Sequence, residues 1–166
     1  WGADHLTGHD PSNGKLLWTC GGVNPKKTKF WRVIASPAAA KGVVAVSYAR
    51  GKVTGGIRVG GTGDITKDAW AWKREGIGAD SVSPVADEAS GTFIVLNDSE
   101  KPRGLVSCLD AGNGKTIWEE QLPKAAQKFY ASPLLAGNKL YMARVDGVVY
   151  CGSVEGKGLT GLTENK

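Results

Sequence analysis

The sequence predicts an all-β fold built from a four-stranded unit that recurs about every 50 residues. Three observations support this prediction: an Asp-to-Trp hairpin segment recurs, a Ser-Pro dipeptide recurs, and a short apolar run follows each Ser-Pro. Helices are not expected, because 24 of the 166 residues are glycine and Pro123 interrupts the best helical candidate, residues 119–130.

The recurring hairpin segment consists of a polar turn followed by a strand that carries tryptophan. Five residue types match between two copies 100 residues apart: Asp10, Asn13, Gly14, Lys15 and Trp18, and then Asp110, Asn113, Gly114, Lys115 and Trp118. Asp64 precedes Trp72 by the same eight residues, which predicts a third copy between them. The Asn-Gly pairs predict type I′ turns, and the aspartates are expected to accept hydrogen bonds from the turn amides.

The Ser-Pro dipeptides mark the start of each unit. They begin at Ser36, Ser83 and Ser132, which are 47 and 49 residues apart. A polar turn and an apolar run follow each one, and the runs at residues 43–48, 92–96 and 139–143 are rich in strand-forming residues. Each unit therefore has one strand after Ser-Pro, one over the apolar run, one that ends at the aspartate and one that carries the tryptophan.

Four strands per repeat of 46 to 54 residues are typical of a β-propeller blade. The chain is expected to be one partial propeller of about three and a half four-stranded antiparallel blades. The predicted segments are a half blade over 1–20 and blades over 33–74, 80–121 and 129–166. Propellers close with roughly four to eight blades, so the remaining blades of the same propeller are an expected partner.

Composition argues against several classes of function. The net charge of +5 is spread along the chain apart from Lys26, Lys27 and Lys29, so nucleic-acid binding is not expected. The longest apolar runs have four residues, far fewer than the roughly 18 that a membrane-spanning helix needs.

No metal site is expected from the cysteines or histidines. Cys20, Cys108 and Cys151 are too far apart in sequence for a metal-binding pair and are interpreted as free thiols. His5 and His9 lie four residues apart, which on a strand separates them by roughly 13 Å.

One set of side chains predicts a binding surface. In a propeller, the segments that lead into the first strand of each blade and those that leave its second strand surround one end of the central channel. Aligned on Ser-Pro, these positions are occupied by Arg32, Asp80 and Tyr130 before the first strands, and by Arg50, Asp98 and Arg144 after the second strands. Such charged and aromatic residues are suited to a protein or a polar ligand, and the alternative interpretation is a solvated rim.

The hairpins and Ser-Pro strands resemble the repeats of the pyrroloquinoline-quinone-binding-like (PQQ-like) β-propellers over nearly the whole chain. The resemblance implies that Trp18, Trp72 and Trp118 dock each blade on the next one. The last blade departs from the pattern, because aligning its Gly156 on Gly114 places Thr160 where the tryptophan is expected.

That family includes quinoprotein alcohol dehydrogenases and the non-catalytic propeller lipoprotein of bacterial outer-membrane assembly. The dehydrogenases stack a quinone on a disulfide between adjacent cysteines, beside a calcium ion. This chain has no adjacent cysteines, and Asp10, Asp64 and Asp110 are assigned to turns, so no catalytic residue and no cofactor are predicted.

The resulting prediction is a non-catalytic scaffold that binds a protein or ligand in the bacterial envelope. Its expected location is periplasmic, outer-membrane-associated or secreted. Two alternatives stay open: a fragment of a PQQ-dependent alcohol or polyol dehydrogenase with PQQ and calcium, and a structural spacer module.

Overall fold

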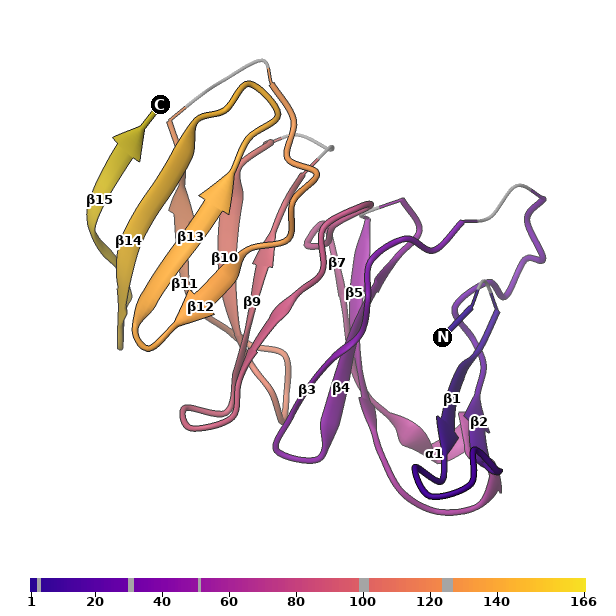
Figure 1. Ribbon diagram of the computed structural model, residues 1–166. Helices are drawn as coiled ribbons and strands as arrows, with labels where there is room; N and C mark the ends of the chain where they lie inside the picture. Colours follow the sequence, from indigo (N-terminus) through magenta and orange to yellow (C-terminus); the bar gives the residue numbers. More distant parts are fainter. Residues whose placement is uncertain (3, 30–31, 51, 99–101, 124–126) are drawn as a thin grey trace.

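The computed structural model describes residues 1–2, 4–29, 32–50, 52–98, 102–123 and 127–166, which form four twisted sheets arranged side by side (Figure 1). Blade 1 contains β1 (Leu6–His9), β2 (Leu16–Cys20) and β6 (Gly63–Asp64). Blade 2 contains β3 (Ala38–Ala40), β4 (Val43–Tyr48), β5 (Val53–Arg58) and β7 (Trp70–Glu75). Blade 3 contains β8 (Val85–Asp87), β9 (Thr92–Leu96), β10 (Leu105–Asp110) and β11 (Thr116–Gln121). Blade 4 contains β12 (Leu134–Ala136), β13 (Lys139–Ala143), β14 (Val149–Glu155) and β15 (Gly158–Asn165).

This architecture confirms the prediction of an all-β partial propeller. In blades 2, 3 and 4, each strand pairs antiparallel with its neighbour in the order in which the chain forms them. The one helix in the described residues, α1 (Thr66–Ala69), is a single turn. No helix in the described part of the chain is long and apolar enough to cross a membrane.

The apolar side chains are buried between successive blades. Three clusters of buried residues fill the three interfaces. Representative members are Leu6, Val46 and Ile57 between blades 1 and 2, Trp72, Phe93 and Leu109 between blades 2 and 3, and Val106, Leu140 and Tyr150 between blades 3 and 4. Because burial of apolar surface is the main favourable contribution to folding, stacking against its neighbours stabilises each blade.

The Ser-Pro positions form a hydrogen-bonded ladder across the blades. The Ser36 amide donates to Ser83 Oγ at 2.9 Å, and the Ser83 amide donates to Ser132 Oγ at 2.9 Å. Each hydroxyl thus satisfies the backbone of the preceding blade, which explains why serine recurs at this position.

Two turns have the same local structure: the turn between β1 and β2 and the turn between β10 and β11. We call residues 10–15 the Asp10 turn and residues 110–115 the Asp110 turn. The carboxylates of the two aspartates accept backbone N–H groups from Ser12 at 2.8 Å and Gly112 at 2.9 Å. The two asparagines likewise accept the amides of Lys15 and Lys115, both at 2.8 Å.

The predicted type I′ geometry of these turns is wrong. A type I′ turn needs positive φ at both central residues, whereas here Gly14 has φ +73° and Gly114 has φ +69°, and neither asparagine has positive φ. The amide of each glycine donates to the carbonyl of the aspartate, at 2.7 and 2.8 Å. The side-chain hydrogen bonds satisfy the other amides, so a longer turn with one left-handed residue is stable.

Asp64 is not the counterpart of Asp10 and Asp110. In blade 2 the third strand, β5, ends at Arg58, and residues 59–69 leave the sheet before β7 begins. Asp64 lies in β6, which pairs parallel with β2 of blade 1, and its carboxylate accepts the Thr66 amide at 2.9 Å. Its spacing from Trp72 therefore does not reflect an equivalent place in the blade.

The three tryptophans occupy the same register position. Trp18 lies opposite Gly8, Trp72 opposite Gly56 and Trp118 opposite Cys108. Trp72 and Trp118 are 8% and 7% exposed, whereas Trp18 is half-buried. In blade 4 the corresponding residue is Thr163, opposite Cys151, and not Thr160, because β14 extends to Glu155 before the chain turns.

Candidate protein-binding surface

The six residues predicted to form a binding rim lie in the segments that lead into β3, β8 and β12 and in those that leave β4, β9 and β13. These segments lie at the ends of the blades that face upward in Figure 1. The side chains differ in their surroundings. Asp98 and Arg144 are engaged within the fold, Asp80 pairs with Arg32, and Arg50 and Tyr130 are exposed.

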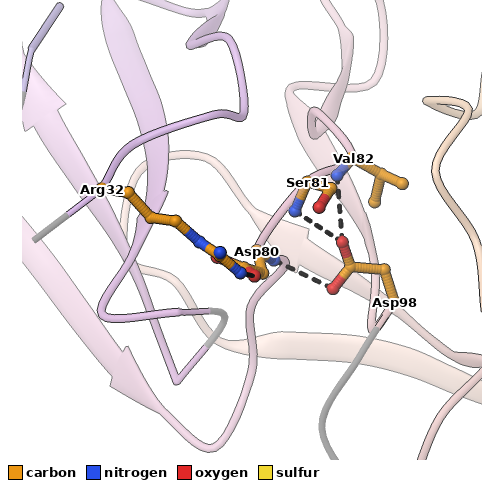
Figure 2. Close-up of polar contacts among 5 residues, drawn as sticks. All are labelled: Arg32, Asp80, Ser81, Val82 and Asp98. Carbon is orange, nitrogen blue, oxygen red and sulfur yellow. Dashed lines mark hydrogen bonds and ion pairs between the residues drawn. The ribbon is translucent and has the colours of Figure 1, made fainter. Parts of the chain in front are cut away.

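Asp98 connects the end of β9 to the segment that leads into β8 (Figure 2). Its carboxylate accepts three successive backbone N–H groups, from Asp80 at 2.9 Å, Ser81 at 2.6 Å and Val82 at 3.1 Å. The residue is 1% exposed. The Asp98 side chain therefore holds this segment in place and does not face solvent.

Arg32 and Asp80 form an ion pair between the segments that lead into blades 2 and 3 (Figure 2). Arg32 Nε donates to Asp80 Oδ1 at 3.2 Å, and a second nitrogen contacts the other carboxylate oxygen. The hydrogen bond with Asp80 is the main reason that the pKa of Arg32 is raised, and Asp98 and Tyr130 contribute electrostatically. Arg32, Asp80, Asp98 and Tyr130 thus belong to one neighbourhood.

The Arg144 side chain makes its hydrogen bonds within blade 4. Its guanidinium donates to both Asp146 oxygens, at 2.9 and 2.6 Å, and to the Tyr150 hydroxyl at 2.5 Å. The hydrogen bond with Arg144 lowers the pKa of Asp146. The Arg144 side chain is only 10% exposed, so it stabilises the turn after β13.

Exposed residues at this end of the blades form what we call the rim surface: Arg32, Ile34, Arg50, Tyr130 and Val145. Tyr130 is 61% exposed, Ile34 53% and Val145 48%. Arg50 has φ +58° and follows Ala49 at φ +57°, two consecutive residues in the left-handed conformation that L-residues seldom adopt. Sequence reasoning did not identify Ile34 and Val145, because an isolated apolar residue in a loop carries no signal of exposure.

Replacing Asp98 with alanine is expected to lower the free energy of unfolding by about 2 kcal/mol, since three backbone N–H groups lose a charged acceptor. Urea unfolding measures the change. The control is Lys41→Ala, which removes an ion pair with Glu88 that is exposed on both sides and should cost less than about 1 kcal/mol. Equal losses in the two variants would contradict the structural role of Asp98.

The groups expected for a quinone site do not come together in the described residues. Cys20, Cys108 and Cys151 are free and lie in three different sheets. Asp10, Asp64 and Asp110 bind amides of their own turns. No group of three or more His, Cys, Asp or Glu side chains in the described part of the chain is placed to hold a metal ion. The described residues therefore do not supply the groups that would hold PQQ with calcium.

Comparison with known proteins agrees with the blade architecture. Residues 64–158 match the family described as outer membrane protein assembly factor BamB, which is built from PQQ-like repeats. The chain belongs to this PQQ-like propeller family. No curated protein sequence matches the chain.

Several solved structures share the fold of this PQQ-like propeller chain at low sequence identity. BamB from Moraxella catarrhalis superposes with a TM-score of 0.63 at 15% identity, covering 98% of this chain and 44% of that one. Quinohemoprotein alcohol dehydrogenase ADHIIG from Pseudomonas putida HK5 also gives 0.63, at 12% identity, covering 89% of this chain and 22% of that one. Sqt1 from Saccharomyces cerevisiae gives 0.66 at 13% identity, covering 96% and 42%. The chain thus spans less than half the length of each of these structures.

Proposed function

We propose that this chain is part of a non-catalytic propeller that binds a partner protein through the rim surface, in the bacterial envelope. The observation that supports this most directly is the exposure of Tyr130, Ile34 and Val145 beside Arg32 and Arg50 at one end of the blades. Aromatic residues and arginine are enriched in protein interfaces, where large apolar side chains supply buried area and arginine supplies hydrogen bonds.

The backbone supports the same proposal. Two consecutive left-handed residues, Ala49 and Arg50, hold the arginine in the turn after β4. Such conformations are destabilising and are found preferentially at functional sites. The match to the BamB family favours an envelope protein that acts in assembly, although the fold alone does not determine function.

A pull-down from bacterial envelope extract tests this function. The variant Arg50→Glu/Tyr130→Ser should lose a partner that the unchanged protein captures. The control variant Lys157→Glu/Ile117→Ser makes the same charge change and a similar apolar loss away from the rim surface, and it should keep the partner. The affinity for the identified, purified partner should then fall at least about tenfold in the rim variant only, since an interface anchor contributes about 2 kcal/mol or more. Equal capture by both variants would contradict the proposal.

A fragment of a quinone-dependent dehydrogenase is the second candidate, because ADHIIG superposes as well as BamB does. Calorimetric titration with PQQ in the presence of calcium, followed by a dye-reduction assay with an alcohol, separates the two candidates. The scaffold proposal predicts no tight quinone binding and no turnover. Sub-micromolar binding of PQQ, or turnover that a chelator abolishes, would favour the dehydrogenase.

A further inference from the structure

A pocket of about 430 Å³ lies between blade 2 and the segment that follows β2 of blade 1. Residues between 22 and 28 form one wall, and the ends of β4, β5 and β7 form the other. We call it the lysine pocket, because Lys26 and Lys73 lie in its two walls. It adjoins the rim surface, since the lining residue Ala49 directly precedes Arg50.

Hydrogen bonds fix both walls of the lysine pocket before anything binds. The Asn24 side chain accepts the Thr28 amide at 2.9 Å and donates to the Thr28 carbonyl at 3.3 Å, which closes this segment into a turn. The Lys27 amide donates to the Asn24 carbonyl at 3.0 Å. The indole N–H of Trp70, from blade 2, donates to the Gly21 carbonyl at 3.1 Å and holds the segment against that blade. A pocket that is formed in advance loses little conformational entropy when a ligand binds.

The lysine pocket contains a set of apolar lining residues. Val23 is 0% exposed and Tyr48 7%, and Val53 is half-buried. The Tyr48 ring packs near Trp70 at a centroid distance of 6.2 Å. Pockets that bind ligands typically have volumes of roughly 300 to 1,000 Å³, a mainly apolar lining and a few polar groups. The pocket therefore has the size and the lining to accept one large apolar side chain.

The charged groups around the lysine pocket are mostly cations. Six exposed cations line it or lie next to a lining residue in the sequence: Lys26, Lys27, Lys29, Arg50, Lys52 and Lys73. None of them forms an ion pair with a carboxylate in the part of the chain that the structure describes. Lys73 lies over the Trp70 ring at 3.9 Å, a contact that does not neutralise its charge. Glu75 contributes a carboxylate to the lining, so the surroundings of the pocket are positively charged overall and attract an acidic ligand.

We propose that the lysine pocket binds an acidic segment of a partner protein, with one large apolar side chain of that segment in the pocket and its carboxylates paired with the surrounding cations. This proposal rests on the proposed function, because it assigns the chemistry of the partner at a surface that continues the rim surface. Strong interface contacts commonly combine a buried apolar anchor with complementary charges around it. A membrane of anionic lipids offers the charge without a side chain that fills the pocket, so it matches only one of the two features.

A peptide titration tests the lysine pocket. The probe is the synthetic peptide acetyl-Glu-Asp-Phe-Glu-Asp-amide, added to the full, isotopically labelled chain while NMR follows the backbone amide signals. The amides of Lys26, Ala49 and Val53 should shift in a saturable way. Those of Gly14 and Gly137 should not, because the β1–β2 and β12–β13 turns lie at the other end of the blades (Figure 1).

Two altered peptides separate the apolar anchor from the charge. One has serine in place of phenylalanine, and the other has glutamine and asparagine in place of the acidic residues. Each should bind at least about tenfold more weakly than the probe, because it lacks either the side chain that fills the pocket or the carboxylates. Binding of the acidic probe should also weaken as the salt concentration rises.

Charge reversal in the protein supplies the matching test. The variant Lys26→Glu/Lys73→Glu should bind the acidic probe at least about tenfold more weakly. The control variant Lys15→Glu/Lys157→Glu makes the same change of net charge at exposed positions in the β1–β2 and β14–β15 turns, and it should bind the probe nearly as well as the unchanged protein. Circular dichroism verifies that both variants are folded.

The proposal is overturned if the probe gives no saturable shift up to its solubility limit, or if the serine peptide binds equally well. It is also overturned if the protein co-sediments with vesicles of phosphatidylglycerol and phosphatidylcholine but does not bind the probe, because the cations then serve a lipid surface. The pull-down separates this proposal from the proposed function. A partner that the Arg50→Glu/Tyr130→Ser variant loses and the Lys26→Glu/Lys73→Glu variant keeps would support the rim surface and overturn the lysine pocket.

Discussion

Replacing Trp72 with alanine is expected to lower the free energy of unfolding by about 4 kcal/mol, the typical cost of truncating a buried tryptophan. Trp72 is 8% exposed and packs between blades 2 and 3 with Phe93 at a ring-centroid distance of 6.3 Å. The substitution leaves a cavity at this interface and removes the donor to the Ala111 carbonyl. Urea unfolding followed by far-ultraviolet circular dichroism measures the loss.

The matched control for this variant is Trp18→Ala. Trp18 occupies the same register position but is half-buried, so its loss should be about half as large. A loss below about 1 kcal/mol for Trp72→Ala would show that the residue does not contribute to the core between blades.

Replacing Gly114 with alanine is expected to cost about 3 kcal/mol. Roughly 1 kcal/mol arises from a positive φ in an L-residue, and the remainder arises because the new methyl group collides with the Trp72 ring. The measurement is again the free energy of unfolding in urea.

Gly14→Ala provides an internal control for that experiment. The two glycines have nearly equal φ and the same turn sequence, but nothing lies within 4 Å of a Cβ at Gly14. This variant should show only the conformational cost of about 1 kcal/mol. Equal losses at the two glycines would mean that Trp72 does not restrict the Asp110 turn.

Local sequence patterns predicted features whose hydrogen bonds close within a few residues. The aspartates at positions 10 and 110 bind amides two residues away, so their role was visible in the repeated sequence. The Asn-Gly pairs in these turns predicted the wrong turn type, because side-chain hydrogen bonds stabilise a longer turn in which only the glycine has positive φ.

Recurrence alone was misleading where a segment left its blade. Asp64 has the expected spacing from Trp72, yet residues 59–69 cross to blade 1 and the aspartate pairs beside Thr19. In blade 4, the longer β14 moved the tryptophan position from Thr160 to Thr163. Spacing predicts register only when no residues are inserted between paired strands.

The sequence by itself determined the all-β class, the strands over the apolar runs and the approximate repeat, because short apolar runs and the turn-forming residues around them are local properties. The tertiary structure decided which polar groups remain accessible. Asp98 and Arg144 look like surface charges in the sequence, but contacts with residues 80–82, Asp146 and Tyr150 engage them within the fold. These contacts lie within blade 3 and within blade 4, and they form only when the strands of each blade pair and bring the ends of its segments together.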